Sequence, residues 1–343
     1  MGPRPTRRVL ALAATTAGAL AGLEVQRRHL GRLKGDEDYA SLSAPLGGRP
    51  FAVSSADGTR LHAERFGLGT GTVVVLAHGW TERLSFWGPV IRRLVDAGLA
   101  PVAYDLRGHG ASAEAADDDY SLERFGDDVE AVLAAALPEG ELGVVAGHSL
   151  GGMSIAAWAD RHDVNRRVHA AALINTALGD LVTGHLLLGA LAKRFEHPAL
   201  SRLLMGSGLR VPPFSTPLQQ AVIRHAAFGP TATAGMVAFY ERMLIECEPA
   251  ARAAAGIALS DMDLWEAVAQ LTVPALVIYG NRDRLTPPAQ ARRIAESLPV
   301  PAGLLELEAT GHMGPLERPA EIAQAIADLT SSPAPASRAA AAR

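Results

Sequence analysis

With 343 residues, 48% hydrophobic and 20% charged, the chain has enough apolar material for one large globular domain or two smaller ones. Its formal net charge of -4 gives no reason to expect nucleic acid or an acidic polymer as a partner. Its single cysteine, Cys247, excludes an intrachain disulfide, and nothing in the composition sets the oligomeric state.

The N-terminus has the pattern of an export signal. Basic residues at 4, 7 and 8 precede an uncharged run over residues 9–23, in which Ala19-Leu20-Ala21 offers a small-x-small cleavage site. As a helix, the run would span about 22 Å, which is less than the ~30 Å hydrocarbon core of a bilayer. We expect an exported or membrane-anchored protein with membrane contact through residues 9–23; the alternative is a cytoplasmic protein with a soluble leader helix. Residues 24–49 are polar and indicate a linker, so residues 1–49 form a signal or anchor segment with its linker.

Strands and helices alternate from residue 51 onwards. Two short strands at 51–55 and 61–66 are joined by the turn signal Ala56-Asp57-Gly58. The continuous apolar run over residues 72–77 is typical of a strand buried on both faces of a parallel sheet. The pattern then predicts a helix at 86–97, a strand at 99–104 and a helix at 121–137.

Two polar loops follow the strands in this first half. In His78-Gly79-Trp80, the glycine permits a sharp turn, after which the N–H of Trp80 can point at a developing oxyanion. We expect the His78 imidazole to hydrogen-bond local backbone and not to act as a base. Residues 105–112 hold Asp, Arg and His, but their spacing matches neither G-x-G-x-x-G nor a Walker loop, which favours a structural turn network.

The most informative stretch is Gly147-His148-Ser149-Leu150-Gly151. It lies between an apolar strand at 142–146 and a helix at 152–160, and a G-x-S-x-G in this position is a nucleophile elbow. Because the turn is so tight, Cβ atoms at Gly147 and Gly151 would strike neighbouring backbone. The turn raises Oγ of Ser149 above the strand end and aims the Leu150 N–H at the same place as the Trp80 N–H.

A helical insertion follows the next strand, which is predicted at 168–174. From residue 178 to residue 264 there is no convincing strand pattern, and the stretch is too long for a connecting loop, so we expect a helical cap over the strand ends. Helical patterns cover residues 181–195, 218–228 and 233–247. Met205, Met236 and Met243 either line an apolar cavity there or pack the cap against the core.

The alternation resumes with a strand at 273–280, and Asp283 lies just past its end. A helix at 288–298 and a strand at 302–308 lead to His312, and a helix at 320–329 completes the fold before an Ala/Pro/Ser-rich tail at 331–343. Ligands in α/β folds bind beyond the carboxyl ends of the parallel strands. Ser149, Asp283 and His312 all follow strand ends and therefore share this rim.

The chain resembles the α/β-hydrolase superfamily over about residues 50–330, apart from the cap. Four motifs carry the resemblance: His78-Gly79, Asp105-Leu-Arg-Gly-His-Gly110, Gly147-His-Ser-Leu-Gly151, and Asp283 paired with Gly311-His312. The resemblance implies an α/β fold, with a mostly parallel sheet and flanking helices in residues 50–177 and 265–330, and the helical cap in residues 178–264.

The same resemblance implies a catalytic triad. Ser149 would be the nucleophile, His312 the base and later the acid, and Asp283 the residue that orients His312, with Trp80 and Leu150 as the oxyanion hole. Some members carry the acid after the preceding core strand, here near Asn175 or Asp180, but Asp283 is preferred. We expect a small-molecule carboxylic ester with an apolar group as substrate, and no cofactor, metal or nucleic acid.

Other activities use the same triad. Cofactor-free haloperoxidases or perhydrolases and carbon–carbon bond hydrolases are the alternatives, and a non-catalytic binding protein on this fold is a remote one.

Overall fold

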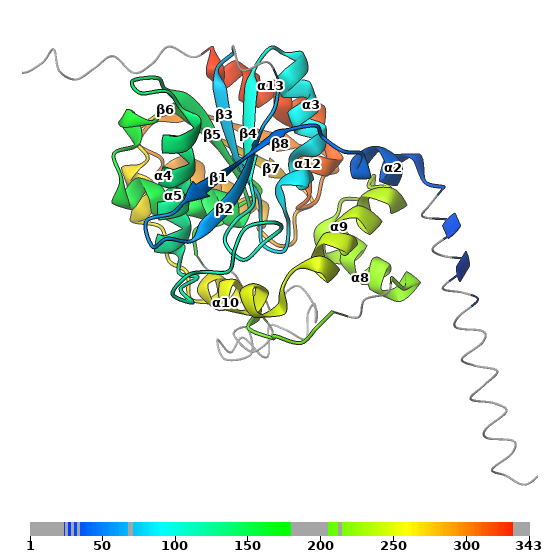
Figure 1. Ribbon diagram of the computed structural model, residues 1–343. Helices are drawn as coiled ribbons and strands as arrows, with labels where there is room; N and C mark the ends of the chain where they lie inside the picture. Colours follow the sequence, from blue (N-terminus) through cyan, green and yellow to red (C-terminus); the bar gives the residue numbers. More distant parts are fainter. Residues whose placement is uncertain are drawn as a thin grey trace, which may run out of the picture.

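The computed structural model describes residues 24, 27–28, 31–32, 35–67, 71–179, 205–211 and 215–331. Its centre is an eight-stranded sheet with the strand order β1-β2-β4-β3-β5-β6-β7-β8 (Figure 1). The strands are β1 (Arg49–Ser54), β2 (Arg60–Arg65), β3 (Val73–Ala77), β4 (Ala100–Tyr104), β5 (Gly143–His148), β6 (Val168–Ile174), β7 (Ala275–Gly280) and β8 (Pro301–Leu307). Each strand begins and ends within two residues of the range predicted from sequence.

The sheet is parallel except at one edge. β1 pairs with β2, and β2 with β4, in the antiparallel sense, while β4, β3, β5, β6, β7 and β8 pair in parallel. The β1–β2 turn forms as its residues predict, because Gly58 takes a positive φ of 88° and the Asp57 carboxylate accepts the Thr59 N–H at 2.9 Å. The predicted α/β fold with a mostly parallel sheet is confirmed.

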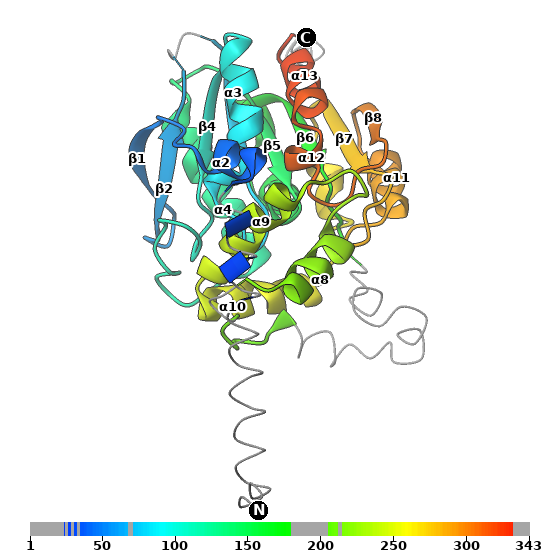
Figure 2. The ribbon, with the colours of Figure 1, turned by 90° about the vertical axis from the view of Figure 1, so that its right-hand side faces the viewer.

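Helices cover both faces of the sheet, so the apolar strands are buried on both sides (Figures 1 and 2). In β3, Val73 and Val75 pack with α4 and α5 in one core, while Val74 and Leu76 pack with α3 and α13 in the other. The described helices are α2 (Glu37–Ser43), α3 (Gly88–Asp96), α4 (Leu122–Ala136), α5 (Leu150–Arg161), α8 (Pro217–Ala227), α9 (Ala234–Glu246), α10 (Pro249–Ser260), α11 (Pro288–Ser297), α12 (Gly314–Glu317) and α13 (Pro319–Thr330).

The polar loop at 105–112 is a structural network, as predicted. The Arg107 guanidinium is fully buried and binds both carboxylate oxygens of Asp128, at 2.8 and 2.7 Å, and Asp57 at 2.8 Å. Asp105 accepts the backbone N–H groups of Leu84 and Ala111. These bonds join the loop to α4 and to the β1–β2 turn, and removing one partner of such a buried pair typically costs 3–5 kcal/mol.

Helices α8, α9 and α10 lie between β6 and β7 in the chain. α8 and α9 occupy the helical ranges expected at 218–228 and 233–247, whereas α10 was not recognised as a separate helix. The helix expected at 181–195 lies outside the described residues. The two ends of the inserted stretch meet, because Gly179 pairs with Asp263 and the Leu264 N–H donates to the Leu178 carbonyl at 2.6 Å.

Helix α2 lies within the segment that reads as a linker in sequence. The Asp36 carboxylate caps it by accepting the Tyr39 N–H at 3.0 Å, Leu42 is buried, and the helix packs against α9 (Figure 2). Its Ser41 carbonyl also accepts a hydrogen bond from Arg92 of α3. Part of residues 24–49 therefore belongs to the folded body. Within the described residues, no helix combines the length and the apolar character needed to cross a bilayer.

Candidate active site

Ser149 lies at the turn between β5 and α5 with a strained backbone. Its φ of 50° and ψ of -116° fall outside the regions that a non-glycine residue ordinarily adopts. A Cβ on Gly147 would lie 2.4 Å from the Gly151 backbone, and one on Gly151 would lie 2.2 Å from the Ala77 carbonyl oxygen. Thr176 fixes the turn by donating its hydroxyl to the Ser149 carbonyl at 2.8 Å. The tight elbow predicted from the pentapeptide is present.

Asp283 is buried at the end of β7 and accepts five hydrogen bonds. One oxygen accepts the N–H groups of Leu285 and Thr286. The other accepts the Asn175 amide at 2.9 Å, the Thr286 hydroxyl at 2.7 Å and His312 Nδ1 at 2.9 Å. Burial by itself raises the pKa of Asp283, but the charge on His312 and these hydrogen bonds outweigh it, so the pKa is lowered overall. Asp283 is therefore held as an acceptor for His312.

His312 lies in the loop after β8, and its ring is fixed from one side. Nδ1 is bonded to Asp283, and the backbone N–H donates to the Ala227 carbonyl at 2.7 Å. His312 and Ser149 line one cavity of about 90 Å³ together. The structure thus brings all three predicted triad residues to the same edge of the sheet.

The cavity that contains Ser149 is mainly apolar. Its other lining residues are Trp80, Glu82, Met153, Met205, Tyr240, Leu259, Leu285, Thr286 and Met313. Of the three methionines considered from the sequence, Met205 lines this cavity, while Met243 is buried in the core and Met236 packs against it. Met205, Tyr240 and Leu259 come from the insertion between β6 and β7, so this insertion forms part of the wall.

Trp80 and Leu150, the two residues expected to form an oxyanion hole, both lie close to Ser149: Trp80 lines the same cavity and Leu150 directly follows Ser149. Leu150 is the first residue of α5, so its N–H has no partner within the helix. Trp80 lines the cavity, and its indole N–H donates to the Arg252 carbonyl in α10 at 2.9 Å, which ties the loop after β3 to the insertion. His78 has the structural role predicted for it, because Nδ1 bonds the Gly79 carbonyl and Nε2 accepts the Leu106 N–H.

Asn175 occupies the position where an alternative acid was considered. Its side-chain amide donates to Asp283 and to the Gly311 carbonyl, so it supports the preferred acid and does not replace it. Asp180 lies outside the described residues.

Sequence reasoning missed four polar residues at this site: Glu82, His148, Tyr240 and Thr286. Thr286 bonds Asp283 and lies 3.2 Å from His312 Nδ1. The Tyr240 hydroxyl reaches Thr81 from α9 at 3.1 Å, and burial raises the pKa of Tyr240. Glu82 and His148 bond each other across 66 positions of sequence. Two of the four carry a local signal, because Thr286 lies three residues after Asp283 and His148 directly precedes Ser149.

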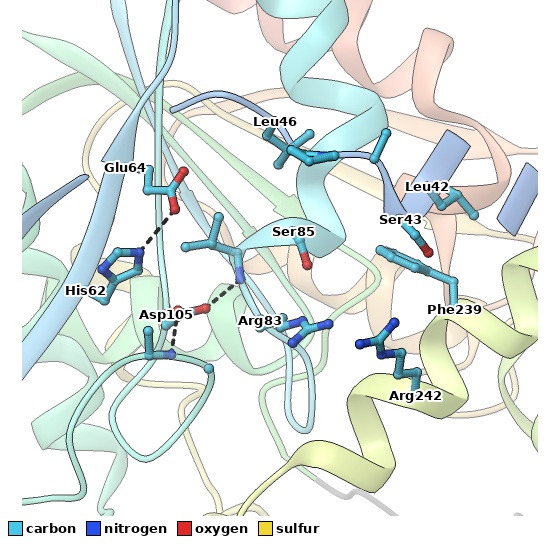
Figure 3. A pocket seen from close by; sticks show the side chains of 15 residues that line it. Leu42, Ser43, Leu46, His62, Glu64, Arg83, Ser85, Asp105, Phe239 and Arg242 are labelled. Atoms are coloured by element: carbon cyan, nitrogen blue, oxygen red, sulfur yellow. Dashed lines mark hydrogen bonds and ion pairs between the residues drawn. The ribbon is translucent and has the colours of Figure 1, made fainter. Parts of the chain in front are cut away.

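A larger cavity of about 460 Å³ lies elsewhere, between β2, α2 and α9 (Figure 3). His62 and Glu64 face it from β2 and bond each other at 3.1 Å, while Arg83 and Arg242 lie across from them. None of Ser149, Asp283 and His312 lines it. The reactive groups, and not the cavity size, therefore identify the candidate active site.

The chain is similar to several known proteins. The chain matches the family model described as serine aminopeptidase, S33, over residues 70–313. It is 29% identical over 267 residues to a pimeloyl-[acyl-carrier protein] methyl ester esterase of Chromobacterium violaceum, covering 76% of this chain and 95% of that protein. It is 37% identical over 98 residues to a non-heme chloroperoxidase of Kitasatospora aureofaciens, but this match spans only 29% of this chain and 34% of that protein.

A thermophilic esterase from Thermogutta terrifontis, solved with malate bound, has the same fold. The TM-score is 0.66 at 21% sequence identity, and the match covers 82% of this chain and 97% of that one.

Proposed function

Because this chain belongs to the serine aminopeptidase S33 family of α/β hydrolases, we propose that it cleaves carboxylic esters through an acyl-enzyme on Ser149. The observation that carries the proposal is the Asp283–His312 hydrogen bond beside the cavity that contains the strained Ser149. A buried carboxylate that fixes one ring nitrogen leaves the other nitrogen to exchange a proton with the nucleophile.

In the proposed reaction, His312 Nε2 takes the hydroxyl proton of Ser149 as Oγ attacks the ester carbonyl. Asp283 holds the imidazole tautomer and stabilises the imidazolium. The N–H groups of Trp80 and Leu150 receive the oxyanion, and losing one such donor typically costs on the order of 10²–10³ in rate. His312 then protonates the leaving alcohol. A water molecule, deprotonated by the same base, hydrolyses the acyl-enzyme and frees Ser149.

The cavity supports an apolar substrate group. Its methionine and leucine side chains can adapt to an alkyl chain, and each buried CH₂ group contributes about 0.8 kcal/mol. An aminopeptidase would need a carboxylate that is free to bind the amino group of its substrate. The one carboxylate among the residues named for this cavity, Glu82, is already bonded to Gly79 and His148.

Perhydrolysis is the second candidate, favoured by the local identity with the chloroperoxidase. It uses the same acyl-enzyme, but hydrogen peroxide replaces water as the second nucleophile and a peracid leaves. Adding peroxide to the ester assay and measuring peracid distinguishes the two reactions.

The test of the proposed function is covalent labelling combined with turnover. A fluorophosphonate probe should label Ser149, and p-nitrophenyl esters should be hydrolysed. Ser149→Ala should abolish both while the protein stays folded by circular dichroism, and His312→Ala should lose nearly as much activity because nucleophile and base act as a unit. Ester hydrolysis that persists in a verified Ser149→Ala protein would falsify the mechanism. Hydrolysis of amino-acid anilides without any ester turnover would refute the substrate class.

A further inference from the structure

His148, the residue before Ser149, is fully buried and has two hydrogen-bond acceptors as partners. Nδ1 lies 3.1 Å from the Glu82 carboxylate, and Nε2 lies 2.8 Å from the backbone carbonyl oxygen of His312. A carbonyl oxygen accepts and cannot donate, so Nε2 must carry a proton. A carboxylate also accepts, so beside an ionised Glu82 Nδ1 carries a proton as well.

Two other buried histidines differ in this respect. His78 faces the Gly79 carbonyl with Nδ1 and accepts the Leu106 N–H at Nε2. His109 faces the Arg107 carbonyl with Nδ1 and accepts the Thr81 N–H at Nε2. One acceptor and one donor suit a neutral imidazole, and burial lowers the pKa of both rings.

The groups around the His148–Glu82 pair favour the charged form. His148 Nδ1 lies 3.1 Å from each of the two Glu82 oxygens, as expected for an N–H shared by a carboxylate. Glu82 also accepts the Gly79 N–H at 2.5 Å. The Phe86 ring lies 4.8 Å from the His148 ring, within the distance at which an aromatic ring stabilises a cation. Burial by itself lowers the pKa of His148, but the Glu82 charge outweighs it and the pKa is raised.

We propose that His148 is an imidazolium paired with the Glu82 carboxylate, and that this buried ion pair positions His312 and the loop of residues 78–80 after β3, here called the oxyanion loop. The pair bonds the Gly79 N–H, which precedes Trp80, on one side and the His312 carbonyl on the other. Gly79 leaves room for it, because a Cβ there would lie 2.9 Å from the Glu82 oxygen and 3.0 Å from His148 Nδ1. The pair thus connects the oxyanion loop, the elbow and the base.

The pair also balances charge beside the reacting atoms. Glu82 lines the cavity with Ser149, where an uncompensated carboxylate would oppose the oxyanion, and the His148 cation neutralises it. The rings of His148 and His312 are 4.9 Å apart, so the charge of the pair lies beside the candidate base. The other titratable groups that act on this cluster are Asp283, His78, His109 and Tyr240.

The charge state can be read without any assay of activity. Nitrogen-15 NMR of histidine-labelled protein, with the His148 signals identified by their loss in His148→Gln, should show both ring nitrogens protonated at pH 8. One unprotonated nitrogen at pH 8 would overturn the ion pair. This NMR result is independent of the proposed ester hydrolysis. The positioning role, in contrast, rests on that proposed function.

The positioning role is tested by pH–rate profiles of kcat/KM. His148→Gln leaves Glu82 uncompensated, so the midpoint of the acidic limb should move up by on the order of one pH unit, with kcat falling more than KM changes. Glu82→Gln/His148→Gln removes both charges and should return the midpoint towards that of the parent. His62→Gln breaks a similar His–Glu pair in the larger cavity and should leave the profile unchanged. If the midpoint of the acidic limb is the same in His148→Gln as in the parent, the electrostatic role is refuted.

Discussion

Glu317 should make the free energy of unfolding of this protein depend on pH. This carboxylate is buried in α12 and accepts two backbone hydrogen bonds, from Gly311 at 3.0 Å and from Gly229 at 2.8 Å. Gly311 precedes His312, and Gly229 lies between α8 and α9. Glu317 therefore joins the loop of the candidate base to the insertion. Burial raises the pKa of Glu317 from 4.5 to about 7.

The sign of the stability effect follows from proton binding. Between pH 4.5 and pH 7, the folded protein keeps the Glu317 proton while the unfolded chain has released it, so stability falls as pH rises through this window. At 1.36 kcal/mol per pH unit, the shift from 4.5 to about 7 corresponds to a loss of about 3 kcal/mol. Above pH 8 both states are ionised, and the loss stays constant.

Urea unfolding of the parent and of Glu317→Gln across pH 4 to 8 measures this loss. Glutamine does not titrate, so the stability of the parent relative to the variant should decline by about 3 kcal/mol over this range, while groups common to both chains cancel. Glu308→Gln is the control, because Glu308 is exposed on the same segment. A difference between parent and Glu317→Gln that stays constant with pH would show that Glu317 titrates alike in both states.

Two further predictions concern substrate and location. With p-nitrophenyl esters of increasing acyl length, kcat/KM should rise over the first few carbons, because each CH₂ group enters an apolar cavity; a flat or strictly acetyl-selective series contradicts this. We also propose that the N-terminal segment directs the protein to a membrane or out of the cytoplasm. A variant lacking residues 1–30 keeps α2, so it should hydrolyse esters normally while losing that location in cell fractionation. Finding both forms in the soluble cytoplasm would contradict the proposal.

The parallel strands were predictable because each contains a short apolar run, whereas β1 and β2 were marked by the turn signal between them. The parallel strands from β3 to β7 are buried on both faces, so their burial is visible in the sequence as continuous apolar character. Helix α2 was not predictable in this way. Its seven residues are mostly polar, and a helix this short depends on the packing of Leu42, which only the rest of the fold supplies, in addition to its local Asp36 cap.

In the site, residues within a local motif were predictable and their supports were not. Ser149, Asp283 and His312 each follow a strand, and parallel topology alone brings strand ends together. The bond between His148 and Glu82 depends on how the loop after β3 folds over the elbow, which no local pattern encodes. Asn175 likewise gains its role only when β6 pairs with β7.

The bridge between Gly179 and Asp263 affects how the chain between β6 and β7 can vary in length during evolution. β6 and β7 are neighbours in the sheet, and the chain between them leaves and returns at one bridge. The Gln290 amide also secures this junction by donating to the Gly179 carbonyl at 2.9 Å. The entropy of closing a loop grows slowly, by about 0.6 kcal/mol for each doubling of its length. Loop-closure entropy therefore sets little limit on the length of chain between these two points, so selection can lengthen or shorten it while the strand ends before Ser149, Asp283 and His312 stay in place.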